Sequence, residues 1–236
     1  MNEIERIKQV YVNRGQVISD NRYTYFNVGN LYIMQQRERE ILRLLSKPSI
    51  NQLSDKNILD VGCGVGGLLR GFIKYGALPE NLWGLDLLSD SIKQAREISP
   101  NIDFRCGDAR QLPYEDECFD IVTAFTVFTS ILDDGMKKRI ASEMLRVLKS
   151  KGIILWYDFH MNNPQNPDVK GVGKVEIKRL FLDCELDFQR VTLAPPLARR
   201  LAPYSWLTCY LLEKIPFLRT HYLSVIWKNQ NMKQSR

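Results

Sequence analysis

Four glycines within six positions, Gly62, Gly64, Gly66 and Gly67, lie directly behind the short apolar run ILDV. Glycine adopts the tight backbone dihedrals of a sharp turn and lets a ligand approach the bare main chain. We therefore expect a loop between a strand and a helix that exposes main-chain amides to a ligand. The spacing of Gly62, Gly64 and Gly67 also matches the G-x-G-x-x-G loop of dinucleotide-binding proteins, so the loop alone does not identify the ligand.

Two carboxylates follow the glycines at the ends of later apolar runs. Asp86, in GLDLLSD, lies about 20 residues after the glycines, at the distance where a carboxylate accepts hydrogen bonds from both hydroxyls of a ribose. Asp108, in CGDARQLPYEDECFDIVTAF, follows a third run and precedes a polar turn, which it could instead cap. Together they predict a ligand that contains a nucleoside.

A parallel sheet would bring these residues to one edge. Short apolar runs alternate with helix-like segments, which is the pattern of an α/β fold with a doubly wound sheet covered on both faces. In the segment 133–151, apolar residues recur at helical spacing, acids come first and lysines last, and Gly152 follows, so we expect a helix there. The predicted strands are 57–61, 82–86, 102–106, 119–125 and 152–159.

Beyond residue 160 this alternation ends. We expect a helix at 175–183, a strand at 186–194 and a last strand at 221–228, with no helix crossing back over the sheet between the two strands. A proline-bounded segment there contains a predicted helix from about Tyr204 to Lys214 that is apolar on nearly all sides. Such a helix is buried, or it contacts a partner or a membrane surface.

Over residues 57–160 the chain resembles the class I S-adenosylmethionine-dependent methyltransferases, in particular small-molecule, type 11-like members. ILDVGCGVGG is similar to their first motif, GLDLLSDSIKQAR to their ribose-binding strand and next helix, and GDARQLPYEDECFDIV to their adenine-side motif. EMLRVLKSKGIILWYDF resembles their helix-to-strand segment, although Lys151 stands where the family often has glycine or proline. The resemblance favours S-adenosylmethionine over a nicotinamide cofactor.

The same resemblance implies a Rossmann-like, seven-stranded sheet that is mostly parallel, with an antiparallel last strand. It implies a single domain over 1–236. Its parts would be an N-terminal helical lid, a cofactor-binding core, a helical insert before the last strand, and that strand with a tail, at 1–50, 51–194, 195–220 and 221–236.

The resemblance also implies roles for residues of the first two motifs. The backbone around Gly62, Cys63 and Gly64 would surround the methionine part of the cofactor. Asp60 would orient the loop or the cofactor's amino group, and Asp86 would bind the ribose.

Further cofactor contacts are implied in the later motifs. Leu87 would pack on the adenine, Asp108 with Ala109 would receive its amino edge, and Phe125 would line the sulfonium and the adjacent acceptor pocket. Leu87 and Phe125 could equally be core residues.

The aromatic cluster RYTYFN at 22–27 lies in the segment expected to form the lid. Tyr25 could hydrogen-bond the cofactor carboxylate or shield the sulfonium, and Arg22 could pair with that carboxylate. The alternative is that both residues pack the N-terminal helix on the core.

Methyl transfer from a sulfonium needs alignment first, and a base only where the acceptor must lose a proton. Asp158 and His160, at the end of the strand 152–159, are the candidate catalytic residues, and strand alternation decides which one reaches the pocket. A hydrogen-bonded loop histidine is the alternative for His160. The five scattered cysteines and two histidines form no metal-ligand pattern, so we expect no metal.

Composition fits one α/β domain of a cytoplasmic protein. The chain has 236 residues, no Cys-x-x-Cys pair, and no apolar run near the roughly 18 residues of a membrane-spanning helix. Its N-terminus, MNEIERIKQV, does not read as a secretory signal.

The net charge of +6 is confined to one region, because residues 195–236 hold seven Lys or Arg and one acid. Nucleic acid, an anionic membrane surface or a solvated face would each explain this excess. The basic residues alternate with prolines and leucines and not with a stacking surface, which argues against nucleic acid.

We therefore expect S-adenosylmethionine-dependent methylation of a hydrophobic or amphiphilic small molecule, with a hydroxyl as acceptor and with contact to a lipid-like substrate or a membrane through 195–220. An N- or C-methyltransferase, a nucleic-acid methyltransferase, and a binding protein without turnover remain the alternatives. The sequence leaves the acceptor and the oligomeric state open.

Overall fold

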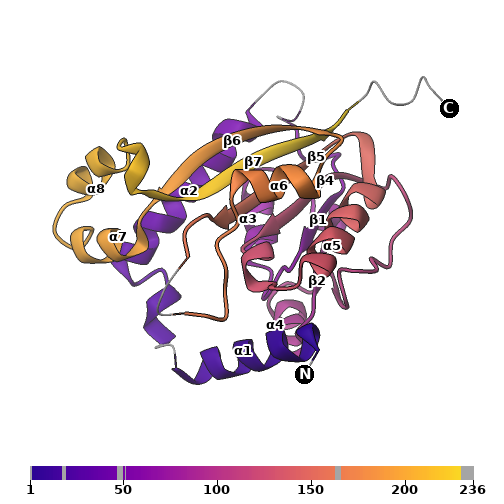
Figure 1. Cartoon of the computed structure of the whole chain (residues 1–236), viewed down its shortest axis with the longest axis horizontal. Helices are drawn as coiled ribbons and strands as arrows, with labels where there is room; N and C mark the ends of the chain where they lie inside the picture. Colours follow the sequence, from indigo (N-terminus) through magenta and orange to yellow (C-terminus); the bar gives the residue numbers. More distant parts are fainter. Residues whose placement is uncertain (1, 18–19, 47–49, 51, 163–165, 230–236) are drawn as a thin grey trace.

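The computed structural model describes residues 2–17, 20–46, 50, 52–162 and 166–229. At its centre lies a seven-stranded sheet with the spatial order β3-β2-β1-β4-β5-β7-β6 (Figure 1). The strands are β1 (Ile58–Val61), β2 (Leu82–Asp86), β3 (Asp103–Cys106), β4 (Phe119–Phe125), β5 (Leu148–Phe159), β6 (Cys184–Leu193) and β7 (Arg219–Lys228). The predicted Rossmann-like sheet is confirmed, whereas the tail after residue 229 lies outside the described residues.

The last strand is antiparallel, as predicted. β1 to β5 pair in parallel, and β7 is antiparallel to both of its neighbours, β5 and β6. β6 therefore runs in the same direction as β5, and its carboxyl end reaches the same edge of the sheet as those of β1, β2 and β4. All four residues of β1 are buried, as expected for a central parallel strand covered on both faces.

Helices form a layer on each face of the sheet (Figure 1). α2 (Val28–Leu45), α3 (Gly67–Lys74) and α4 (Ser89–Ile98) share one buried apolar cluster with the sheet. α1 (Glu3–Val17), α5 (Asp134–Val147) and α6 (Lys174–Leu180) contribute to the cluster on the opposite face.

The structure corrects the predicted end of α5. The helix ends at Val147, and residues 148–151, which were expected to be helical, open β5 instead. Leu148 pairs with Phe119 of β4, and a bulge between Phe119 and Ile121 precedes the next pair. Pairing with a neighbouring strand thus overrides the local helical pattern, because helix propensity is a weak preference that tertiary contacts outweigh.

The segment before β7 holds two short helices, where the sequence predicted one. They are α7 (Pro195–Leu201) and α8 (Trp206–Leu212), followed by the 3₁₀ turn η4 (Pro216–Leu218). α7 begins with two prolines, whose missing N–H costs nothing in the first helical turn. Figure 1 shows α7 and α8 at the left-hand end of the molecule. In the part of the chain that the structure describes, no helix is long and apolar enough to cross a bilayer.

Candidate active site

A cavity of about 400 Å³ lies at the edge of the sheet where β1, β2 and β4 end. Strand order reverses between β1 and β4, and open parallel sheets bind their ligands at such a reversal. The lining comes from the glycine loop, the loops after β2 and β3, the end of β4 and the turn after it, and helices α1 to α5. Its volume is within the range of small-molecule sites.

The glycine loop has a backbone that glycine adopts most readily. The φ angles of Gly62 and Gly64 are +74° and +52°. A Cβ on Gly62 would lie 2.5 Å from Cγ2 of Val127, whereas a Cβ on Gly64 would meet nothing within 4 Å. Gly62 therefore permits close packing against the segment after β4, and Gly64 leaves room for a ligand in the cavity that both residues line.

Three amides of this loop are not free donors, contrary to the expectation from sequence. The N–H groups of Gly62 and Cys63 donate to the carbonyl oxygen of Leu85, at 2.7 Å and 3.1 Å. The N–H of Gly64 donates to Oδ2 of Asp86 at 2.8 Å. These bonds tie the loop to β2, so these three positions offer a ligand their shape and not exposed N–H groups.

Asp86 holds the loops after β1 and β2 together and lines the cavity. Its Oδ2 accepts from Gly64 N–H, and its Oδ1 accepts from Leu88 N–H at 2.9 Å. Burial raises the pKa of Asp86, while backbone N–H groups oppose that rise. Each carboxylate oxygen has two acceptor sites, so one remains on each oxygen for the two hydroxyls of a ribose.

Asp60, at 3% exposed, is the most deeply buried acid of the cavity lining. Oγ1 of Thr123, on the neighbouring strand β4, donates to its Oδ1 at 2.6 Å. Burial raises the pKa of Asp60 to about 7, and the Thr123 hydroxyl and the charge of Arg37 act in the opposite direction. A cationic group in the cavity would favour the ionised form of Asp60.

Asp108 caps a turn and also lines the cavity. Its neighbour Ala109 lines the cavity as well. Oδ1 of Asp108 accepts from the amide of Arg110 at 2.9 Å, and Oδ2 accepts from Nε of the same residue at 2.8 Å. Burial alone would raise the pKa of Asp108, but the hydrogen bonds from Arg110 hold it below its usual value. The two readings of Asp108 considered from sequence are therefore compatible.

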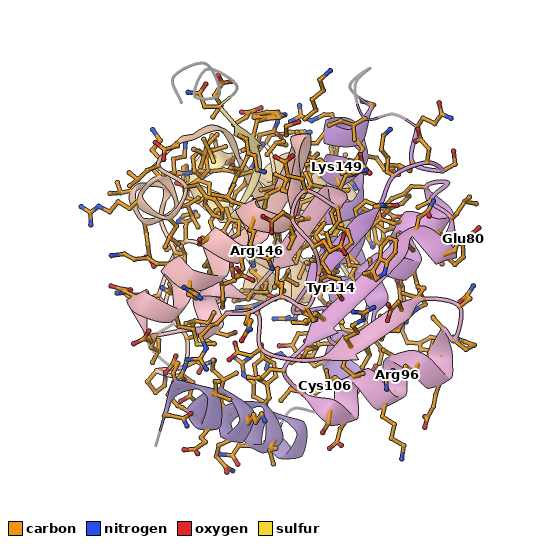
Figure 2. All side chains as sticks on the ribbon, turned by 90° about the vertical axis from the view of Figure 1, so that its right-hand side faces the viewer. Glu80, Arg96, Cys106, Tyr114, Arg146 and Lys149 are labelled. Atoms are coloured by element: carbon orange, nitrogen blue, oxygen red, sulfur yellow. The ribbon has the colours of Figure 1, made fainter. Side chains whose placement is uncertain are left out.

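The loop that carries Asp108 is fixed from α5. Arg146 donates to the carbonyl oxygens of Leu112 and Tyr114 at 2.9 Å and 2.8 Å, and it pairs with Asp116 at 2.7 Å. Figure 2 shows Arg146 and Tyr114 near one another on this face of the molecule. Arg146 therefore fixes residues 112–116 of the loop, which follow its cavity-lining start.

Apolar side chains complete the lining. Leu87 lines it from the loop after β2, and Phe125 from the end of β4. The ring of Phe125 stacks on that of Tyr157 of β5, with centroids 5.2 Å apart. The guanidinium of Arg37 lies 5.9 Å and 5.6 Å from the centroids of these two rings.

The N-terminal helices line the cavity through residues that the sequence did not single out. These are Ile7 and Tyr11 of α1 and Arg37 of α2. The Tyr11 hydroxyl lies 3.1 Å from Oγ of Ser130, in the turn after β4. The sequence did contain a signal for Arg37. It lies four residues after Ile33 on a predicted helix, and this spacing puts the cation on the same helical face as the apolar side chain.

The two lid candidates lie elsewhere. Neither Arg22 nor Tyr25 lines the cavity. Tyr25 is 63% exposed, and the guanidinium of Arg22 lies 5.9 Å from the ring centroid of Tyr23. The structure thus places helix α1, and not the aromatic cluster at 22–27, at the cavity.

The two candidate bases also lie outside the lining. Asp158 is fully buried and accepts from the Thr129 hydroxyl at 2.5 Å, the Phe128 amide at 3.1 Å and the Trp156 indole at 3.1 Å. Burial raises its pKa to about 7. Nε2 of His160 lies 3.1 Å from the carbonyl oxygen of Arg219. Asp158 supports the turn after β4 and has no direct access to a ligand in the cavity.

Comparison with known proteins agrees with this geometry. Residues 58–152 match the family described as a methyltransferase domain. A phthiotriol/phenolphthiotriol dimycocerosates methyltransferase of Mycobacterium ulcerans (strain Agy99) is 38% identical over 114 residues, 48% of this chain and 41% of that protein. Norajmaline N-methyltransferase of Rauvolfia serpentina is 32% identical over 142 residues, 55% of this chain and 47% of its own length. The chain thus matches less than half the length of these relatives.

Among solved structures, the PH0226 protein from Pyrococcus horikoshii OT3 superposes with a TM-score of 0.60 at 20% identity, covering 83% of this chain and 89% of that one. This likeness shows a shared fold. The family match covers the middle of the chain. Residues 58–152 are therefore similar to a methyltransferase domain, and the chain shares the fold of the PH0226 protein.

Proposed function

We propose that this protein transfers a methyl group from S-adenosylmethionine to an apolar or amphiphilic small molecule. The observation that carries the proposal is a single cavity lining that combines three carboxylates, Asp60, Asp86 and Asp108, with the glycine loop at the reversal of strand order. Each carboxylate lies near or just after the carboxyl end of a different strand, so a ligand that contacts all three must extend along the sheet edge, as an adenosyl group joined to methionine does.

The chain offers a partner for each part of that cofactor. Asp86 has acceptor sites left for the ribose hydroxyls, and Asp60 matches the α-ammonium group. Arg37, the one cationic side chain in the described lining, would pair with the carboxylate. Leu87 and Ala109 would contact the adenine, and the open space at Gly64 would admit the methionine part.

When bound, S-adenosylmethionine supplies an activated methyl group, which leaves the sulfur as its bond to the acceptor forms. The contribution of the chain is orientation, which in general is worth roughly 7–11 kcal/mol of a barrier. Asp60, Asp86 and Arg37 would fix the cofactor at three points, and Phe125 would shield the reacting centre from water. None of these residues is free to act as a base for the acceptor.

We further propose that the acceptor atom is an oxygen acidic enough to be ionised without help, such as that of a phenol or a carboxylic acid. Asp158 and His160 lie outside the cavity lining, which favours an acceptor that needs no base. The hydroxyls of Tyr11 and Ser130 line the cavity 3.1 Å apart, and Ser130 also donates to the carbonyl oxygen of Thr126 at 3.3 Å, so either hydroxyl would exchange its present acceptor for an anionic oxygen. Every acid of the described lining has a role at the cofactor, which leaves none for a cationic amine.

The test is incubation with S-adenosylmethionine carrying a labelled methyl group and four matched sets of acceptors: phenols, carboxylic acids, aliphatic alcohols and amines with similar apolar bodies. We expect label in the first two sets, with a rate that rises with the ionised fraction of the acceptor. Preferential labelling of amines would overturn the oxygen assignment alone. Cofactor binding without transfer to any set would overturn the methyltransferase activity and leave a binding protein.

A further inference from the structure

The segment between β6 and β7 carries a group of large apolar side chains on its surface, which we call the insert patch. Its members and their exposed fractions are Tyr204 88%, Phe217 74%, Leu207 67%, Leu211 59% and Tyr210 46%. Leu207, Tyr210 and Leu211 are three or four residues apart on α8 and therefore share one helical face. Large apolar side chains that are exposed together on one helical face mark a contact with a partner or a membrane.

The opposite side of α8 is anchored in the protein. Cys209 is fully buried in a small cluster with Tyr32 of α2. Glu213, at the end of the helix, accepts a hydrogen bond from the Tyr32 hydroxyl at 2.5 Å and pairs with Arg39 at 3.0 Å. The helix is thus held in one orientation, and the exposure of its outer face is a property of the fold.

Charge on the insert favours an anionic partner. Glu213 is the only acid in residues 195–236, and its side chain is turned inward, 5% exposed. Lys214 is 55% exposed, and its Nζ lies 4.2 Å from the ring centroid of Tyr210 and 3.7 Å from Oε1 of Glu213. Arg200 at the end of α7 is exposed as well. The same cations would repel each other across a contact between two insert patches.

The segment that carries the insert patch leaves the sheet at the end where the cavity lies. α7 and α8 follow the carboxyl end of β6, which reaches the same sheet edge as the strands that form the cavity. Aromatic and leucine side chains on one face of a helix, with flanking lysine and arginine, are the composition of helices that lie in the plane of a bilayer surface. A few buried apolar side chains or a few cations alone bind a bilayer only weakly, so the two together give binding that is measurable but reversible.

We propose that the insert patch binds the surface of a bilayer that contains anionic lipids, with α8 lying in the interface. The contact is separate from methyl transfer. It would stand even if the acceptor were a water-soluble molecule, and it needs no spanning helix.

Binding to vesicles tests the proposal with the full chain. The assay is co-sedimentation with vesicles of phosphatidylcholine, with and without about 30 mol % phosphatidylglycerol. We expect binding to the anionic vesicles, weakened about tenfold or more in Leu207→Ser/Leu211→Ser. The control Val175→Ser/Leu182→Ser changes two side chains that are equally exposed, at 65% and 78%, in and after α6, and it should bind as the unchanged protein does.

A second pair of variants tests the charge. Arg200→Gln/Lys214→Gln should weaken binding to anionic vesicles about tenfold and leave weak binding to pure phosphatidylcholine unchanged. Calorimetric binding of S-adenosylmethionine should be the same in all variants, which excludes unfolding as the cause.

Three outcomes would overturn the proposal: no binding to either kind of vesicle, equal loss in the α6 control, or a dimer in sedimentation without lipid that the Leu207→Ser/Leu211→Ser change abolishes. The last result would make the patch an interface between two copies of the chain.

Discussion

Replacement of Asp86 by alanine tests the cofactor site most directly. In the structure the carboxylate accepts from Gly64 N–H at 2.8 Å and from Leu88 N–H at 2.9 Å. One acceptor site per oxygen remains for a ribose hydroxyl. Asp86→Ala therefore removes both proposed bonds to the cofactor and one bond that ties the glycine loop to β2.

The size of the effect follows from these bonds. A hydrogen bond to a charged group contributes about 1.5–3 kcal/mol, so two such bonds are worth about 3–6 kcal/mol. That corresponds to a dissociation constant for S-adenosylmethionine about 10² to 10⁴ times higher. The loop bond affects stability as well, so the melting temperature must be measured alongside.

Isothermal titration calorimetry with S-adenosylmethionine and with its demethylated product measures the change. Asp90→Ala is the matched control, since Asp90 is an exposed acid in the first turn of α4 outside the cavity lining. A 2′-deoxy analogue of the product should show a smaller loss on Asp86→Ala, because it lacks one hydroxyl. An affinity within threefold of the unchanged protein, in a folded Asp86→Ala variant, would refute the ribose assignment and with it the orientation of the cofactor.

Four further predictions follow from the same geometry. Because burial raises the pKa of Asp60 to about 7, the affinity for the cofactor should fall about tenfold per pH unit below 7. Calorimetry should show that this pH dependence disappears in Asp60→Asn. A pH dependence that persists in the variant would argue against the ammonium contact. Arg37→Ala should weaken binding of S-adenosylmethionine more than that of 5′-methylthioadenosine, which has no carboxylate, and an equal loss for both would contradict the assigned pairing. Gly62→Ala should lower the melting temperature by about 4–8 °C, since a positive φ and a contact at 2.5 Å cost on the order of 2 kcal/mol. The control is Gly173→Ala, which has open space around the added Cβ and should leave the melting temperature unchanged. Asp158 binds a proton more tightly in the folded state, with a pKa of about 7, so its contribution to stability is full below about pH 4 and is lost as the pH rises to 7. Chemical unfolding should therefore show Asp158→Asn gaining on the unchanged protein by on the order of 4 kcal/mol across that window, and a constant difference would contradict the raised pKa.

The sequence predicted the strands well where they are short and bounded by turns. β1, β2, β3 and β4 begin and end within a residue of the expected positions. Prediction failed at residues 148–151, where a helical pattern was overridden by pairing with β4. It also missed α7, because two successive prolines indicate a break unless the chain beyond them is known to be helical.

The residues that line the cavity were likewise predicted only in part. The nine expected cofactor residues from Asp60 to Phe125 all line it, because each belongs to a motif at the end of a strand, and the carboxyl ends of parallel strands meet at one edge. Arg22 and Tyr25 do not line it, whereas Tyr11 and Arg37 do. Whether the lining residues bind the cofactor as proposed stays a prediction for the experiments above.

The sequence by itself determined the glycine loop, the carboxylates after it and the succession of strands along the chain, since these depend on local backbone preference and on hydrophobic period. Only the tertiary structure decided which face of α1 and α2 meets the cavity, that Asp158 is directed at Thr129 and away from a ligand, and that one side of α8 remains uncovered. The physical reason is that a helix or strand carries side chains in several directions, and the direction that becomes a site is chosen by the elements packed against the others.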